Sequence, residues 1–147
     1  MTKYTVGFMF TPLLDIVALI RKNKPAWQFG KLNGIGGHIE ESEFPLVCQR
    51  REFHEEAEYP YDEIWSPYLL LQSPEFEVHC FATTGMIHKL HYKTDEKIEL
   101  IHVNSIGNRS DTIENIPWMV YLAVDFLQDR RPGFTVANYT VLPGDGK

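Results

Sequence analysis

Acidic side chains are concentrated around residues 52–56, and their spacing could hold a divalent cation. Glu52, Glu55 and Glu56 stand at i, i+3 and i+4, so on a helix of about 100° per residue they share an arc of about 100°. Their mutual repulsion weakens a helix by about 0.2–0.5 kcal/mol per pair, and Arg51 offsets only part of it. Carboxylate oxygens suit Mg²⁺, which a few carboxylates hold together with substrate phosphates. The triplet by itself is equally compatible with a solvated acidic helix face.

A helix that begins at Pro45 is expected to carry these carboxylates. Proline fits the first helical position because its missing N–H has no intrahelical partner there. A separate apolar stripe is predicted on another side of the same helix, formed by Leu46, Phe53 and Ala57. The helix would therefore pack through one face and present its charge on the other.

A glycine-rich loop, with Gly34, Gly36 and Gly37, precedes the helix. Glycine allows backbone conformations closed to other residues and lets a ligand approach closely. The whole stretch reads Gly37, five residues, Glu43, seven residues, Arg51-Glu52-Phe53, one residue and Glu55-Glu56. This pattern resembles the Nudix box, G-x5-E-x7-R-E-U-x-E-E-x-G-U with U an aliphatic residue, and six fixed positions match it in identity and register.

The chain departs from the box at its end, where Glu58 stands in place of glycine and Tyr59 in place of the aliphatic residue. Glycine at such a position commonly ends a helix in a left-handed conformation. We expect Pro60 to end the helix instead, because proline disfavours helical geometry in the residue before it. The departure concerns the loop after the helix and not the cluster of carboxylates.

The resemblance implies a single Nudix domain over residues 1–147, folded as an α/β/α sandwich with a mixed β-sheet between helices. Residues 143–147 are expected to form a loose tail. Further parts of the sandwich are read from the sequence pattern. Strands are predicted at 3–10, 13–20, 67–73, 76–84, 96–103 and 134–142, with short strands within 26–40, a second helix at 116–127, and 67–84 forming a hairpin.

The resemblance also implies Mg²⁺ as cofactor, for which Mn²⁺ can substitute. Its expected ligands are Glu52, Glu55, Glu56 and the backbone carbonyl of Gly36. Glu43 and Arg51 would form a supporting pair, with Arg51 orienting the carboxylates through charge-assisted hydrogen bonds.

The general base is left open between several glutamates. Glu52 or Glu55 of the box could serve. A further glutamate before a later strand could instead bind metal or activate water, and Glu96 matches that place best, with Glu99 second. For Glu96 a plain surface position is an equal alternative.

Substrate contacts are expected from the loop and from the second helix. The segment 31–37 is similar to the Lys-Trp-Asn-Gly-Phe-Gly-Gly that leads into the box in triphosphate-hydrolysing members, so Asn33 is a candidate contact to a base edge. Its alternative is a turn residue. Gly37 and His38 are candidate contacts near the phosphates, His38 alternatively being an exposed loop residue. Trp118 would line a base pocket or belong to the core.

The implied activity is hydrolysis of the diphosphate linkage of a nucleoside diphosphate derivative, foremost a nucleoside triphosphate, with oxidised purine nucleotides included. Within enzymes, a nucleotide sugar, a dinucleoside polyphosphate or capped RNA are alternative substrates. A Nudix-fold module that binds a nucleotide without cleaving it is an alternative of another class. The expected partner is a small nucleotide, and the expected assembly is a monomer or a homodimer.

Composition restricts the remaining possibilities. A length of 147 residues with 44% hydrophobic residues fits one globular domain. The net charge of −6 argues against a binder of duplex nucleic acid. No apolar run approaches the ~20 residues of a membrane span, and the N-terminus lacks a signal-peptide layout, so a cytoplasmic protein with reduced Cys48 and Cys80 is expected. His88 and His91 lack the further ligands of a zinc site.

Overall fold

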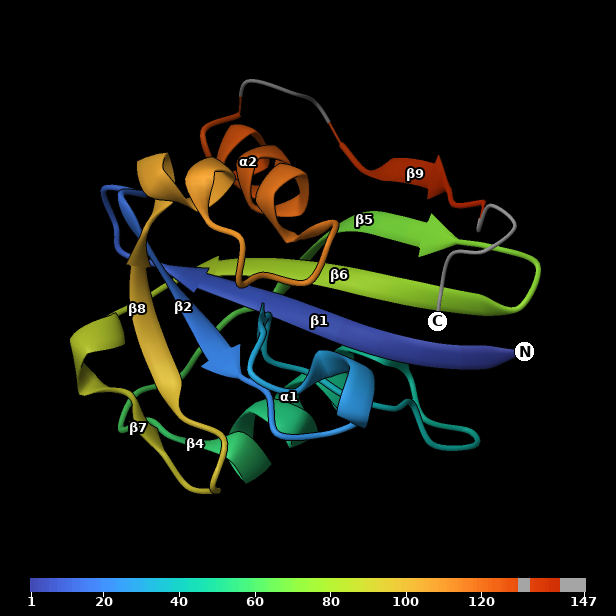
Figure 1. The fold of residues 1–147 in the computed structure, drawn as a ribbon, viewed down its shortest axis with the longest axis horizontal. Helices are drawn as coiled ribbons and strands as arrows, with labels where there is room; N and C mark the ends of the chain where they lie inside the picture. The colour runs from blue at the N-terminus through green and yellow to red at the C-terminus, as the bar shows by residue number, and fades with distance from the viewer. Residues whose placement is uncertain (130–132, 141–147) are drawn as a thin grey trace.

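A mixed β-sheet lies between two helices in the computed structural model, which describes residues 1–129 and 133–140 (Figure 1). The strands of this sheet are β1 (Thr2–Phe10), β2 (Ile16–Arg21), β3 (Leu32–Asn33), β5 (Ser66–Gln72), β6 (Phe76–Thr84), β8 (Ile98–His102) and β9 (Thr135–Asn138). They lie in the order β3-β2-β1-β6-β5-β9, and β8 also pairs with β2. β1 is parallel to β6 and β5 to β9, whereas the other pairs are antiparallel. The predicted mixed sheet, with its hairpin β5–β6, is confirmed.

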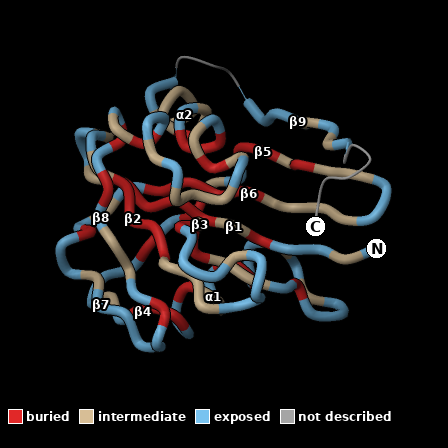
Figure 2. Tube along the Cα trace, in the orientation of Figure 1, coloured by how far each residue is buried: buried red, intermediate tan, exposed pale blue. Residues whose placement is uncertain are grey.

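Each face of the sheet is covered by one helix. The helices are α1 (Pro45–Glu56), which begins at the predicted residue, and α2 (Ile116–Leu127), which covers the predicted residues. α1 packs through Phe53 into a core that contains Met9, and α2 packs through Val120 into a second core that contains Phe8. Neighbouring residues of β1 enter different cores because side chains alternate along a strand. Buried residues accordingly run along the central strands and the inner sides of both helices (Figure 2), which is the α/β/α sandwich expected.

A two-stranded sheet ends the carboxylate helix, so the prediction that Pro60 does so is wrong. Ala57, directly after α1, is extended, with φ −138° and ψ 142°. It starts β4 (Ala57–Glu58), which pairs with β7 (His91–Tyr92). Pairing with another strand therefore draws the chain out of the helix before proline is reached, and Glu58 needs no left-handed conformation.

Two further expectations about packing are corrected by the structure. Leu46 is 44% exposed and does not belong to the apolar face of α1, whose buried residues are Cys48, Gln49, Phe53 and Glu56. The strand expected from residue 13 begins only at Ile16, because Leu14 has a positive φ of 61° in a turn. The Thr11 hydroxyl accepts the backbone N–H of Ile16 and fixes that turn.

The remaining segments are short. The described part of the chain contains three 3₁₀ helices between the longer elements, η1 (Ala26–Gln28), η2 (Ile87–Lys89) and η3 (Val103–Asn108). The predicted last strand is present as β9. Residues 141–142 of that prediction lie outside the described residues, and so does the expected tail at 143–147. Within the described residues no helix is long and apolar enough to cross a membrane.

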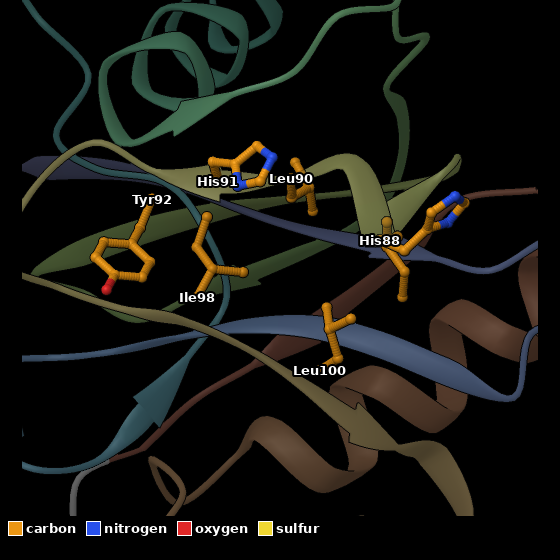
Figure 3. Close-up of a pocket in the computed structure, with 7 residues that line it drawn as sticks. His88, Leu90, His91, Tyr92, Ile98 and Leu100 are labelled. Carbon is orange, nitrogen blue, oxygen red and sulfur yellow. The ribbon is translucent and has the colours of Figure 1, made fainter.

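A pocket of about 390 Å³ opens between η2, β7 and β8 (Figure 3). Its lining is Ile87, His88, Leu90, His91, Tyr92, Ile98 and Leu100. No feature of the sequence indicated a cavity there, because its walls come from segments that are separated along the chain.

Candidate active site

The glycine loop is held against β1 by backbone hydrogen bonds. Gly7 and Ile35 exchange N–H···O bonds of 2.7 and 3.0 Å, and the Thr5 N–H donates to the Gly37 carbonyl at 2.8 Å. The side chain of Gln49, fully buried on α1, donates to the Ile35 carbonyl at 3.0 Å. Loop, strand and helix are thus joined at one point, and Gln49 is a positioning residue that the sequence did not single out.

Glycine is required in this loop for space and not for a left-handed backbone. Gly36 and Gly37 are not among the described glycines with positive φ, which corrects the expectation of unusual conformations here. A Cβ on Gly36 would lie 2.1 Å from the Thr5 carbonyl oxygen, and one on Gly37 would lie 2.4 Å from the carboxyl carbon of Glu52. The loop therefore approaches β1 and the Glu52 carboxylate more closely than any other residue permits.

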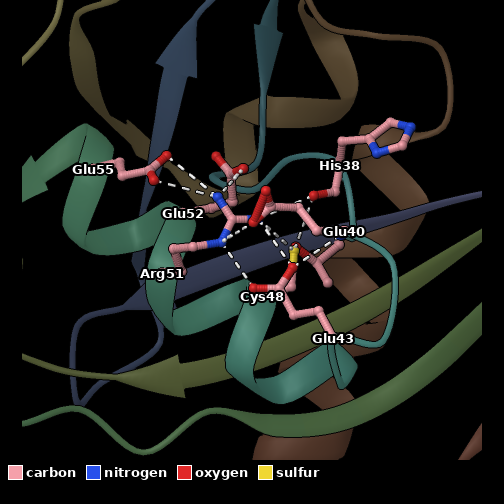
Figure 4. A network of polar contacts seen from close by, with 8 residues as sticks. His38, Glu40, Glu43, Cys48, Arg51, Glu52 and Glu55 are labelled. Atoms are coloured by element: carbon pink, nitrogen blue, oxygen red, sulfur yellow. Dashed lines mark hydrogen bonds and ion pairs between the residues drawn. The ribbon is translucent and has the colours of Figure 1, made fainter.

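Arg51 is the centre of a polar network that joins α1 to the loop (Figure 4). Its guanidinium binds Glu43 through two hydrogen bonds of 2.8 and 3.0 Å. It also donates to Glu52 at 3.1 Å, to Glu55 at 3.3 Å and to the His38 carbonyl at 3.1 Å. The hydrogen bonds from Arg51 to Glu43 lower the pKa of Glu43 to about 2, so the Glu43 carboxylate stays charged. The geometry is that of the supporting pair expected for Glu43 and Arg51.

Two of the box carboxylates are withdrawn from water. The Glu52 side chain is 15% exposed, and Glu56 is 8% exposed with an Oε2 atom that has no hydrogen-bond partner. Burial raises the pKa of Glu56 to about 8; the Lys22 ammonium opposes this shift, and the carboxylates of Glu52 and Glu96 add to it. Burial also raises the pKa of Glu52, against the opposing charge of Arg51. Glu55, in contrast, is largely exposed.

Metal-free protein is expected to lose stability as the pH rises from about 4.5 to about 8. Unfolded chain releases the Glu56 proton near the ordinary pKa of 4.5, whereas folded chain keeps it up to about 8. Between these values the folded state binds more protons, so the free energy of unfolding falls by up to about 1.4 kcal/mol per pH unit. Urea denaturation in EDTA measures this slope, and Glu56→Gln should reduce it. An unchanged slope in the variant would assign the effect to other groups.

Glu96 is buried, which overturns its reading as a plain surface residue. Its carboxylate binds the Lys22 ammonium at 3.1 Å and accepts backbone N–H groups of Asn23 at 2.7 Å and Lys24 at 3.3 Å. Burial acts to raise its pKa, but these bonds prevail and hold the pKa below its usual value. Because its charge raises the pKa of Glu56, it belongs to the same cluster.

Glu99, the second choice for that role, lies elsewhere. Both of its carboxylate oxygens bind the Arg21 guanidinium, at 2.6 and 2.7 Å, and Arg21 also binds Asp111. Arg109 completes this network through Asp111. Glu99 therefore joins β8 to β2 in a structural ion pair, and its described hydrogen bonds go to Arg21 and not to α1.

Lys22 is a further charged residue that the sequence did not single out. Its side chain is 17% exposed, and its ammonium lies 3.1 Å from the Glu96 carboxylate. The charge of Lys22 also opposes the rise in the pKa of Glu56. The backbone of Lys22 exchanges hydrogen bonds with Lys31 and Gly30, which fixes its position. In the sequence, Lys22 belongs to an ordinary polar turn. It reaches Glu96 because β2 pairs with β8, which places the end of β2 next to the segment before β8.

The side chains of the three candidate substrate contacts other than Gly37 are accessible to different degrees. His38 is exposed, and its ring packs edge-on against Tyr4 with the ring centroids 5.3 Å apart. Asn33 lies in β3, where its amide accepts the Gly34 N–H and donates to Gln28, so both ends are used within its own segment. Trp118 is 39% exposed and donates its indole N–H to Asn115, so it is not a core residue.

The carboxylates have the chemistry to bind a divalent cation, although their side chains are not arranged as a complete set of metal ligands. Within the described residues no three His, Cys, Asp or Glu side chains converge as a metal site. Arg51 binds Glu52 and Glu55, while the buried Oε2 of Glu56 has no partner. Hard oxygen ligands with an unsatisfied buried atom suit Mg²⁺. Both cysteines, Cys48 and Cys80, are buried free thiols.

Comparison with models of protein families and with curated protein sequences finds no match for this chain. Solved structures do match its fold. A NUDIX hydrolase from Nitrosomonas europaea superposes with a TM-score of 0.70 at 16% identity, over 94% of this chain and 79% of that chain. A NUDIX family hydrolase from Clostridium perfringens gives 0.67 at 19% identity, over 86% and 97%. A MutT structure, from work on Aliivibrio salmonicida and Vibrio cholerae, gives 0.63 at 13% identity, over 84% and 96%.

The chain therefore has the fold of the Nudix hydrolases, as the resemblance of residues 37–56 to the box predicted. At these identities the likeness establishes the fold.

Proposed function

We propose that the chain is a Nudix hydrolase that uses Mg²⁺ to cleave the diphosphate linkage of a nucleoside diphosphate derivative. The observation that carries this proposal is the buried carboxylate of Glu56, whose Oε2 atom has no hydrogen-bond partner and whose pKa the charges of Glu52 and Glu96 help to raise. A buried acid with no partner lowers stability unless a ligand completes its bonding. At clustered carboxylates beside a glycine loop, a cation would supply the missing bond to the Glu56 oxygen, and a diphosphate would bind to that cation.

The side chains divide the work of this reaction. Bound Mg²⁺ would neutralise the phosphate oxygens and lower the pKa of the attacking water. Glu52, Glu55 and Glu56, with the Gly36 carbonyl, are the proposed ligands. Arg51, held by Glu43, keeps Glu52 and Glu55 in place.

The proton of the attacking water needs an acceptor close to neutral pKa. Glu96 suits this role poorly, because the hydrogen bonds that it accepts hold its pKa below the usual value. We propose that Glu96 positions Lys22 and repels Glu56, and that Glu52 is the base. Glu55 is the alternative base, since it lies nearer to solvent.

A nucleoside triphosphate, including an oxidised purine one, is the first substrate to test. Nucleotide sugars, dinucleoside polyphosphates and capped RNA also contain a diphosphate linkage, and they are the next substrates to test. The proposed partner is a small nucleotide. We propose that the protein itself is a monomer or a homodimer and lies in the cytoplasm. A module that binds nucleotides without cleaving them is the competing proposal, and the complete set of box carboxylates favours the enzyme.

The test is hydrolysis of this substrate panel by EDTA-treated protein, with and without added Mg²⁺ or Mn²⁺. We expect phosphate or pyrophosphate release from at least one nucleotide only when a divalent cation is present. Calorimetric titration with the same nucleotides identifies a binding module, which would bind and release no product. Folded protein that neither binds Mg²⁺ nor cleaves any member of the panel contradicts the proposal.

A further inference from the structure

The pocket between η2, β7 and β8 has the chemistry of a site for an uncharged ring. Its lining contains no lysine, arginine, aspartate or glutamate, so it offers a phosphate no permanent positive charge. Apolar side chains form much of its wall: Ile87 is buried, Leu90 and Ile98 are half-buried, and Leu100 is 45% exposed. Such surfaces favour a group that leaves water readily.

Planar polar side chains stand on the same pocket. His88, His91 and Tyr92 are all exposed, and their rings lie around the apolar side chains of the pocket (Figure 3). Aromatic and imidazole rings stack on the flat faces of heterocycles, while their polar edges exchange hydrogen bonds with ring nitrogens and carbonyls. A planar heterocycle uses both properties of this lining, whereas a purely aliphatic ligand uses one.

The pocket is joined directly to the carboxylate cluster through the backbone. Tyr92 pairs with Ala57, the residue after Glu56, and paired strands lie only about 5 Å apart. The Lys93 N–H donates to the Glu56 carbonyl at 3.0 Å, and its ammonium donates to the His54 carbonyl at 2.7 Å. On the other wall, Ile98 follows Glu96 by two residues. One molecule with a diphosphate and a ring could therefore contact both places.

We infer that this pocket binds the nucleobase of the substrate while the carboxylates bind its diphosphate. The inference rests on the proposed function and names the part of the site that selects the base. It differs from the expectation for Asn33, because the amide of that residue is already bonded at both ends within its own segment. In the pocket, the rings of His88, His91 and Tyr92 are exposed, and so is Leu100 on the apolar wall.

Binding of nucleosides that carry no phosphate tests the pocket independently of any catalysis. The probes are adenosine, guanosine and uridine at millimolar concentration, followed by NMR through the His88, His91 and Tyr92 ring signals. We expect at least one nucleoside to shift these signals. Leu100→Trp, which fills the pocket from β8, should weaken that binding about tenfold, the scale of one lost stacking contact.

Two variants keep the result interpretable. Leu13→Trp adds the same side chain at a turn position that is 84% exposed and does not line the pocket, and it should leave nucleoside binding unchanged. Tyr92→Leu keeps an apolar side chain but removes a ring, and it should weaken binding without filling the pocket. Equal behaviour of Leu100→Trp, Tyr92→Leu and Leu13→Trp overturns the inference, as does the absence of any shift.

Kinetics then separate this inference from the proposed function. Leu100→Trp should raise KM about tenfold for the best nucleotide and leave KM unchanged for methyl diphosphate, which has no ring. If no phosphoanhydride is cleaved but nucleosides still bind here, the proposed function fails and the pocket assignment stands. If nucleotides are cleaved and Leu100→Trp leaves every KM unchanged, the pocket assignment fails alone.

Discussion

Glu56→Gln is expected to lower turnover by about two to three orders of magnitude while the protein remains folded. The variant removes a carboxylate that we propose as a metal ligand, and loss of a few kcal/mol of charge stabilisation has this effect on rate. Folding should survive because burial raises the pKa of Glu56 to about 8, so at pH 7 the metal-free acid is mostly neutral. Glutamine has almost the same shape and is neutral too.

The comparison requires both a rate and a melting temperature. Glu58→Gln makes the same chemical change at an exposed position two residues later and should keep wild-type turnover and stability. Mg²⁺ should raise the melting temperature of wild type and of Glu58→Gln, and raise that of Glu56→Gln much less. A Glu56→Gln protein that unfolds at 25 °C would show that the side chain is structural. A Glu56→Gln protein with wild-type turnover would show that Glu56 has no part in catalysis.

Gly37→Ala is expected to lower turnover by about two orders of magnitude. Its backbone is not in the left-handed region, so the added methyl group, and not strain in φ, causes the effect. That methyl would lie 2.4 Å from the Glu52 carboxyl carbon and must displace this carboxylate. A misplacement of about 1 Å in a catalytic site costs on the order of 100-fold. Stability should change little, because the group that moves is the end of a flexible side chain.

Gly36→Ala gives the contrasting result one residue earlier. Its methyl group would meet the Thr5 carbonyl oxygen at 2.1 Å, and this backbone atom belongs to β1 and cannot move aside. We expect Gly36→Ala to lose several degrees of melting temperature or more, whereas Gly37→Ala loses activity first. Turnover and thermal unfolding of both variants decide the matter. Equal loss of stability in the two would mean that the loop is needed for folding alone.

Several features of the fold follow from local sequence. α1 begins at Pro45 as predicted, because proline suits a first helical position, and α2 extends over the predicted residues 116–127. β1 and the hairpin of β5 and β6 agree with their aromatic and β-branched composition. The predictions that failed depended on contacts outside their own segment. Leu46 had an apolar type but no neighbour to cover it, and the end of α1 was set by pairing with β7.

The site divides in the same way. Spacing along one helix determines that Glu52, Glu55, Glu56 and Arg51 lie close together, and the resemblance to the Nudix box adds Glu43. The structure gives each of these glutamates a different environment. Glu55 is largely exposed, while Glu52 and Glu56 are withdrawn from water and their pKa values are raised. Burial depends on which segments cover a residue, and no local pattern contains that information.

The sequence by itself determined the helix, its charge and the glycine loop, since these arise from residue types at short spacing. The tertiary structure alone decided that Glu96 is buried with Lys22 and that Glu99 pairs with Arg21 instead. It also decided that a pocket lies between η2, β7 and β8. Those contacts join residues more than 30 positions apart, and their partners are chosen when the sheet closes between its helices.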